Sequence, residues 1–276
     1  MTQTYGTLRV GRSGDGVLGV VIDAPPMNLI GPGLVHDLVT LLSELESDED
    51  SRVMVLESAD PEYFVPHVDL TKVAEYTAEA AKAGGPDDAS LGMLWHKLSE
   101  LPAVTIAKIR GRARGAGSEL ALACDMRFAA RENAILGQIE VGAGATPGAG
   151  GAQHLARLLG RGRAMEAILG ADDFDADLAE RYGWINRALP DAELDAFVAR
   201  LARRIASFPA DAVRSAKRVL NDLTLPGADA IRADARRFHQ LVVSDAAKDR
   251  TAALFAQGLQ ARGPLELDLG DRLGSL

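Results

Sequence analysis

Two glutamates occupy positions where a carboxyl group could do acid–base chemistry. Glu140 stands among apolar and very small residues, between segment 137–139 and the glycine-rich stretch 141–151, where a carboxylate would be poorly solvated. A desolvated carboxyl has a raised pKa and can hold a proton near neutral pH. Glu119 lies in the first turn of a predicted helix that follows the small residues 115–117. Each also has a simpler interpretation, an exposed turn residue for Glu140 and a capped helix start for Glu119.

The small residues before Glu119 make this helix start suited to a partial negative charge. Gly115, Ala116 and Gly117 let the backbone turn tightly and let another group approach it closely. Free N–H groups and the positive end of the helix dipole favour an incoming partial negative charge there. Residues 142–151 are also rich in glycine, but they lack the lysine and the strand-to-helix context of phosphate-binding loops.

The elements that must position these residues are those of an α/β fold. Short apolar, β-branched runs at 8–10, 17–22, 53–56 and 104–107 predict strands, the last two buried on both faces. Apolar residues recur at helical spacing across 33–45. Strand, helix and buried strand in this order indicate a right-handed βαβ crossover.

The later chain contains a surface segment and a helical end. Residues 76–90 combine Ala, Glu and Lys with a breaker cluster at 83–88, so we expect a mobile surface helix and loop there. After Asp191 the sequence is almost continuously helical. Residues 263–276 have little periodicity, which predicts a tail.

Composition narrows the classes of function. The chain has 276 residues, of which 47% are hydrophobic and 25% charged, as in an ordinary globular protein. Its net charge of −9 disfavours nucleic acid. No apolar run approaches the roughly 18–20 residues that span a bilayer, and the N-terminus lacks the features of a signal peptide. Cys124 is the only cysteine, which excludes an internal disulfide and disfavours a cysteine-based metal site. We therefore expect a cytoplasmic protein with no nucleic-acid or membrane partner and no metal.

Several segments, in their order and spacing, resemble landmarks of the enoyl-CoA hydratase/isomerase (crotonase) superfamily. They are the two glutamate-bearing segments 118–125 and 137–140 and the following stretch 147–153. The resemblance extends from about Thr7 to Phe255 and is densest around these segments.

The resemblance implies an α/β fold of the crotonase type, a spiral of ββα units, in residues 1–200. Residues 201–276 would form a helical C-terminal region and tail, which family members use to pack subunits into trimers, often paired as hexamers. Apolar positions such as Leu194, Val198 and Leu201 are more than one thin peripheral layer needs. We therefore expect a homotrimer or hexamer.

The resemblance also implies a site. In this family two backbone N–H groups form an oxyanion hole for the thioester carbonyl of an acyl-coenzyme A, and here they would belong to Val68 and Ala116. In the hydratases the residue matching Glu119 helps to activate a water for attack at C3, and the one matching Glu140 exchanges a proton at C2. Because both glutamates are present, the leading expectation is hydration of a 2-enoyl-CoA. Coenzyme A would enter as part of the substrate, without a metal or redox cofactor.

Three departures from the family pattern keep alternatives open. His67 stands where the family usually has glycine, Arg114 replaces a common apolar residue, and no Lys-Arg pair follows Phe255. We expect His67, Arg114 and Gly142 at the pocket, the glycine because small residues there suggest a roomy acyl site. The alternatives are double-bond isomerisation, thioester hydrolysis, or non-catalytic acyl-CoA binding, which His67 makes credible.

The remaining expectations concern single side chains. The ring of His67 either turns outward or lies at the pocket mouth, and in both cases residue 67 should have negative φ, because positive φ strains a side chain other than glycine. Cys124 is interpreted as a packed thiol, and His154 as a helix residue that faces solvent.

Overall fold

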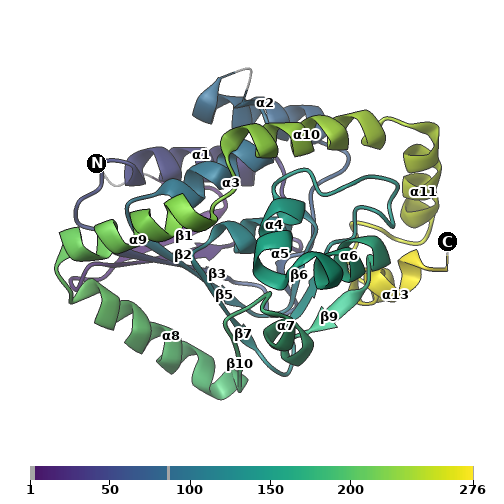
Figure 1. The fold of residues 1–276 in the computed structure, drawn as a ribbon. Helices are drawn as coiled ribbons and strands as arrows, with labels where there is room; N and C mark the ends of the chain where they lie inside the picture. Colours follow the sequence, from purple (N-terminus) through teal and green to yellow (C-terminus); the bar gives the residue numbers. More distant parts are fainter. Residues whose placement is uncertain (1–3, 86–87, 276) are drawn as a thin grey trace.

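A six-stranded sheet runs through the middle of the protein (Figure 1). The computed structural model describes residues 4–85 and 88–275. The strand order is β1-β2-β3-β5-β7-β10, with β1 antiparallel to β2 and the other neighbours parallel. These strands are β1 (Leu8–Arg12), β2 (Val17–Ile22), β3 (Val53–Ser58), β5 (Val104–Ile109), β7 (Met126–Ala130) and β10 (Arg187–Leu189). The four strands expected from the sequence are confirmed.

A second sheet has four strands in the order β4-β6-β8-β9. They are β4 (Tyr63–Val65), β6 (Arg112–Arg114), β8 (Ile135–Gly137) and β9 (Asp173–Asp175). In sequence, β4, β6 and β8 directly follow β3, β5 and β7. The chain therefore adds one strand to each sheet, and one or more helices then lead it back to the large sheet. The result is a spiral of ββα units, as predicted.

The burial of individual residues explains why these segments form strands. In β2, Leu18, Val20 and Ile22 are 0% exposed, whereas the residues between them are partly exposed. This is the two-residue period of a strand with one buried face. In β3, all residues of 53–56 are buried, as predicted for a strand covered on both sides.

Helices from the first half of the chain share one apolar core with the sheet. They are α1 (Pro32–Leu45), α2 (Val73–Gly84), α3 (Leu91–Glu100) and α4 (Ala116–Ala123). Three further helices lie beside the second sheet: α5 (Gly151–Leu159), α6 (Arg161–Gly170) and α7 (Ala176–Tyr182).

Helix α8 (Asp191–Ala206) covers the opposite face of the large sheet (Figure 1). Leu194, Val198, Ala202 and Ala206, spaced four residues apart, pack against β3, β5 and β7. Leu201 is partly buried against the same cluster. The apolar positions that suggested a subunit interface are therefore taken up by the sheet, and that line of reasoning was wrong.

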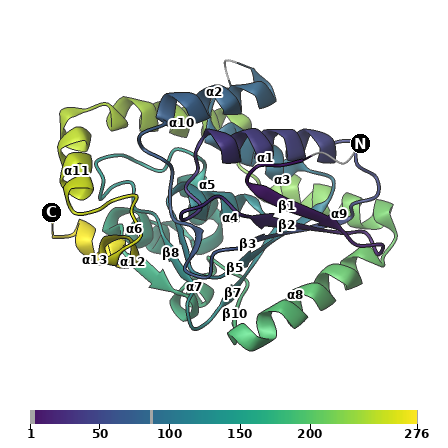
Figure 2. The same ribbon diagram turned by 180° about the vertical axis from the view of Figure 1, so that it is seen from behind.

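The C-terminal helices run from one end of the molecule to the other (Figure 2). In chain order they are α9 (Ala210–Thr224), α10 (Ala228–Val242), α11 (Asp245–Ala256), α12 (Pro264–Leu267) and α13 (Leu269–Leu273). Helix α9 lies at the end away from the second sheet, α10 crosses the molecule, and α11, α12 and α13 lie at the end that holds the second sheet (Figures 1 and 2). The prediction of a tail was wrong, because Leu265, Leu269 and Leu273 are buried in an apolar cluster with Leu254 of α11.

Segment 76–90 is only partly a surface segment. Tyr76 and Ala80 of α2 are 3% and 1% exposed, so this helix contributes to the core. Residues 86–87 of the predicted breaker cluster lie outside the described residues. Within the described ranges, no helix has the length and apolar character needed to cross a membrane.

Candidate active site

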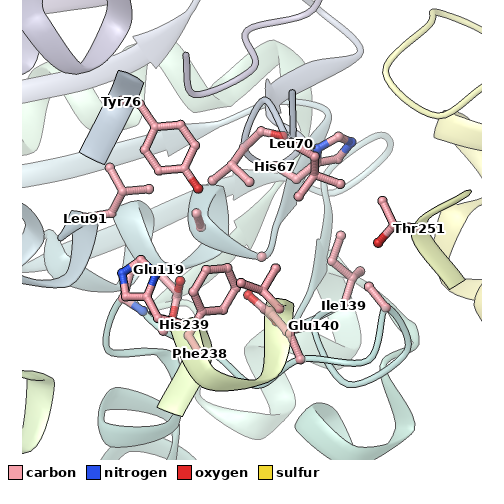
Figure 3. Close-up of a pocket in the computed structure, with 18 of the residues that line it drawn as sticks. His67, Leu70, Tyr76, Leu91, Glu119, Ile139, Glu140, Phe238, His239 and Thr251 are labelled. Carbon is pink, nitrogen blue, oxygen red and sulfur yellow. Dashed lines mark hydrogen bonds between the residues drawn. The ribbon is translucent and has the colours of Figure 1, made fainter. Parts of the chain in front are cut away.

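One cavity collects side chains from both halves of the chain (Figure 3). It holds about 950 Å³ of empty space, its open mouth included. The walls come from segment 67–70 after β4, the loop after β8, and helices α2, α3, α4, α10, α11 and α13. They are mainly apolar, and Glu119 and Glu140 are the carboxyl groups that line them.

Glu119 is held by the backbone in a position that water cannot solvate. It lies in the first turn of α4 and is 2% exposed. Its Oε1 accepts hydrogen bonds of 2.8 Å from the N–H groups of Ala149 and Gly151. Burial raises the pKa of Glu119 to about 7, although these two bonds oppose the rise, and the negative charge of Asp234 adds to it. The carboxyl can therefore change its protonation state near neutral pH.

Glu140 faces the same cavity from the loop after β8 (Figure 3). It is 8% exposed, so the interpretation as an exposed turn residue was wrong. Burial, and then the negative charge of Glu119, raise the pKa of Glu140 well above its ordinary value. Gln138 opposes this rise with its Nε2, which lies 3.4 and 3.3 Å from the two carboxyl oxygens. The pair is arranged to share protons rather than to ionise together.

The backbone at Val68 presents a free N–H group. Ile30 N–H donates to the His67 carbonyl over 3.0 Å, and Asp69 N–H donates to the Ile30 carbonyl over 3.0 Å. In a trans peptide the C=O and N–H point in opposite directions, so the Val68 N–H points away from Ile30. Within the described residues it donates to no backbone carbonyl, and Val68 lines the cavity.

Ala116 provides a second free N–H group at the start of α4. Gly115 has φ +51°, a conformation that suits glycine, and its carbonyl accepts the bond from Glu119 N–H. A Cβ on Gly117 would lie 1.9 Å from the Val65 carbonyl oxygen, so only glycine lets α4 approach β4 this closely. Ala116 N–H donates to no carbonyl in the described part of the chain, and the residue lines the cavity beside Glu119.

The chain matches a known protein family. A model of the enoyl-CoA hydratase/isomerase family matches residues 12–261. The chain belongs to this family. A short-chain-enoyl-CoA hydratase of Clostridium acetobutylicum is 34% identical over 73% of this chain and 76% of that protein. A crotonyl-CoA hydratase of Syntrophomonas wolfei is 34% identical over 71% and 74% of the two chains. A crystal structure of a protein proposed to be an enoyl-CoA hydratase from Streptomyces avermitilis has a TM-score of 0.98 and 64% identity, covering 100% of this chain and 99% of that one.

The crotonase fold expected from the sequence is thus confirmed, and the site residues can be placed within it. His67 is among the residues that line the cavity (Figure 3), as expected, and its ring does not turn outward to solvent. It is 5% exposed, and its ring lies between the Val68 carbonyl, 2.8 Å from Nδ1, and Glu266, whose Oε1 is 3.0 Å from Nε2. In the described chain, the non-glycine residues with positive φ are Asn28, Ala171 and Gln260, so the prediction of negative φ at His67 is confirmed.

Arg114 and Gly142 are not among the residues that line the cavity of this crotonase-family protein. Arg114 is 0% exposed, and its guanidinium donates four hydrogen bonds, two to the Asp173 carboxylate and one each to the carbonyls of Glu266 and Leu267. A Cβ on Gly142 would lie 2.8 Å from a methyl group of Leu273, so the glycine allows α13 to pack closely instead of widening the pocket. The placement of both residues at the pocket was wrong.

The cavity also contains residues that sequence reasoning missed. Tyr76, Phe238 and His239 line it, as do Leu269 and Leu273 from the C-terminal turns (Figure 3). The four-residue spacing of the two leucines was a signal for a buried helical face. No pattern in the sequence marked the other three.

Two single-residue interpretations can be compared with the structure. Cys124 is 2% exposed, and burial raises the pKa of its thiol to about 12, which confirms a packed, unreactive thiol. His154 is 9% exposed, so its assignment to solvent was wrong. Burial, followed by the nearby charges of Arg127 and Arg157, lowers the pKa of His154 to about 4.

Proposed function

We propose that this protein adds water across the double bond of a 2-enoyl-CoA thioester and forms a 3-hydroxyacyl-CoA. The observation that carries the proposal is a pair of buried carboxyl groups, Glu119 and Glu140, in one apolar cavity with the free N–H groups of Val68 and Ala116. A carbonyl oxygen held by the two N–H groups would place the adjacent double bond near the carboxyls.

The surroundings of the two carboxyls favour different protonation states. Glu119 accepts two backbone N–H bonds, which stabilise a carboxylate, whereas Glu140 has only the long contacts from Gln138. Around neutral pH we therefore assign the proton of the pair to Glu140. Glu119 is then the general base for water, and Glu140 is the general acid.

In the proposed reaction the base and acid act at adjacent carbons. Glu119 takes a proton from water as the water oxygen bonds to C3, and the electrons of the double bond move into the thioester as an enolate. The N–H groups of Val68 and Ala116 hold the enolate oxygen, a type of interaction in which one donor contributes about 2.7–4 kcal/mol. Glu140 then gives its proton to C2, the carbonyl re-forms, and transfer of the proton from Glu119 to Glu140 restores the starting state. One water is added, and no redox cofactor or metal is required.

The alternatives from the sequence have less support. Non-catalytic binding depended on the ring of His67 obstructing the hole, but both ring nitrogens face Glu266 and the Val68 carbonyl. Isomerisation and thioester hydrolysis have no specific observation in their favour. The names of the Clostridium and Syntrophomonas relatives support a short acyl chain, so we propose crotonyl-CoA as the first substrate to test.

The proposal is tested by incubating the protein with crotonyl-CoA and with unsaturated, branched and aromatic acyl-CoA thioesters. Mass spectrometry would show a gain of one water for hydration, an unchanged mass with altered retention for isomerisation, and free coenzyme A for hydrolysis. Binding of all thioesters without any product would refute the proposal in favour of a binder.

Further proposals concern assembly and location. We propose a homotrimer or hexamer in the cytoplasm, without a nucleic-acid or membrane partner. Support for assembly comes from α9, where Val219, Leu220 and Leu223 are 56%, 60% and 76% exposed. Exposed apolar groups of this size are typical of interfaces. Light scattering at micromolar concentration tests the proposal, and a mass near 29.2 kDa would contradict it.

A further inference from the structure

The C-terminal turn around Glu266 contacts both segments that carry the free N–H groups. Glu266 is 0% exposed. Its carboxyl oxygens lie 3.0 and 3.2 Å from His67 Nε2, and its backbone carbonyl accepts a 2.6 Å bond from Arg114 Nη1. His67 directly precedes Val68, and Arg114 stands two residues before Ala116. Glu266 therefore contacts the segment of Val68 through its side chain and the segment of Ala116 through its main chain.

Both ring nitrogens of His67 face hydrogen-bond acceptors. Nδ1 lies 2.8 Å from the Val68 carbonyl oxygen, and Nε2 faces the Glu266 carboxyl. A neutral imidazole has one N–H and can donate to only one of these acceptors, whereas the protonated ring donates to both. Burial raises the pKa of Glu266, but the hydrogen bond and charge of His67, the N–H of Gln260 and the charge of Arg114 outweigh it and hold that pKa below its ordinary value. With the ring protonated and the carboxyl ionised, this contact is a buried ion pair.

This ion pair fixes the backbone on the far side of Val68. The peptide before Val68 is held by Ile30 N–H on the His67 carbonyl. The peptide after it is held by His67 Nδ1 on the Val68 carbonyl, with Gln260 Nε2 3.5 Å from the same oxygen. Because both flanking carbonyls are bonded, the Val68 N–H cannot turn away from the cavity without breaking one of these contacts.

Arg114 provides the second connection. Its Nε donates to Asp173 Oδ1 over 2.6 Å, a second bond joins Nη2 to the other carboxyl oxygen, and Nη2 also lies 3.1 Å from the Leu267 carbonyl. These contacts fix the end of β6, from which the chain enters Gly115 and α4. The side chain of Arg114 therefore links the start of α4 to the C-terminal turn.

We propose that Glu266 is a positioning residue for the oxyanion hole, acting through His67 on the N–H of Val68 and through Arg114 on the N–H of Ala116. The inference rests on the proposed function, in which both N–H groups hold the thioester oxygen. Glu266 itself does not line the cavity, so it acts on the carbonyl only through these two neighbours.

The test compares Glu266→Gln with the wild type and with Asp271→Asn. Glu266→Gln keeps the size of the side chain and removes its charge, and Asp271→Asn makes the same change at an exposed position of α13. Infrared difference spectra of bound butyryl-CoA, a saturated thioester that cannot be hydrated, with a 13C-labelled carbonyl, report how strongly the hole polarises the carbonyl. We expect the carbonyl band of Glu266→Gln to move back toward that of the free thioester. Its kcat should fall on the order of 10- to 100-fold, with little change in KM. This is less than the loss of kcat expected when one N–H donor of the oxyanion hole is removed altogether. Asp271→Asn should match the wild type.

Two substitutions at His67 test whether the carbonyl shift depends on positioning and not on overall stability. They also keep the proposal testable if Glu266→Gln fails to fold. The side-chain nitrogen of His67→Asn lies as many bonds from Cβ as Nδ1, and that of His67→Gln as many as Nε2. His67→Asn can donate to the Val68 carbonyl but does not reach Glu266, and His67→Gln can reach Glu266 but not that carbonyl, so both should lose carbonyl shift relative to the wild type.

An unchanged carbonyl band and kcat in a folded Glu266→Gln protein would overturn the proposal. A carbonyl shift equal to that of the wild type in folded His67→Asn, which lacks the contact with Glu266, would also overturn it. The band is recorded on bound thioester without turnover, so it is independent of the hydration assay. A wild-type protein that fails to hydrate any enoyl-CoA would refute the proposed function, whereas a carbonyl shift that depends on Glu266 would still support the positioning role.

Discussion

Replacing Glu119 with glutamine should stabilise the folded protein at alkaline pH while it removes hydration activity. The amide oxygen of glutamine can still accept the N–H bonds from Ala149 and Gly151, so the local structure is retained. The substitution removes only the group that ionises, and with it the proposed general base.

The size of the effect follows from the pKa of Glu119, which burial raises from 4.5 to about 7. One pKa unit corresponds to about 1.4 kcal/mol, so ionised Glu119 costs the folded state about 3 kcal/mol relative to the unfolded chain. Because the pKa is higher in the folded state, that state binds more protons between roughly pH 4.5 and 7, and wild-type stability falls as pH rises through this window. Above it the cost is constant.

Urea unfolding at several pH values between about 4 and 8 measures this difference. We expect Glu119→Gln to be more stable than the wild type by about 3 kcal/mol at pH 8 and by little at pH 4. Glu49→Gln, at an exposed position, is the matched control and should follow the wild type. Parallel stability profiles for Glu119→Gln and the wild type would show that Glu119 is well solvated, and retained hydration would exclude it as the base.

Three further perturbations test other parts of the site. Glu140→Gln should leave the fold intact, lower turnover by about 10²–10⁴, and slow the exchange of the C2 hydrogens of bound butyryl-CoA with heavy water; exchange at the wild-type rate would show that another group moves the proton. Ala116→Pro removes an N–H at the first position of α4, where proline is well tolerated, so kcat should fall by about 10²–10³ without loss of helix, measured by steady-state kinetics and circular dichroism. Deletion of residues 264–276 removes Leu265, Leu269 and Leu273, each worth about 1.5–3 kcal/mol of burial, so the melting temperature and activity should both drop; an active truncated protein would contradict the role of α13 in the cavity wall.

The local pattern of apolar and small residues was sufficient to predict most of the fold and the burial of the Glu140 carboxyl. The strands at 17–22 and 53–56 could be predicted because apolar residues alternate in the first and are continuous in the second. The neighbours of Glu140 are small and apolar, so its desolvation could also be anticipated. The motifs shared with a known family then placed Glu119 and Glu140 in one site.

The errors arose where burial depends on elements that are distant in sequence. His154 lies on α5 between Gln153 and Leu155, and α10, about eighty positions later, packs on that helix. From sequence alone Arg114 appears as a charged residue at an apolar position, because its partners Asp173 and Glu266 are distant in the chain. The leucines of the C-terminal turns have the spacing of a helix, but Asp268 interrupts the run between α12 and α13.

The contact between His67 and Glu266 joins residues 199 positions apart. Contacts of such sequence separation form late, because closing a long loop costs chain entropy before any contact compensates for it. During synthesis the N-terminal part of the chain folds first, so the segment of Val68 would emerge and pack long before Glu266 leaves the ribosome. Only when the turns up to Leu273 have emerged can the thioester site close. In a growing polypeptide, competence to bind substrate would therefore report that this last segment has docked.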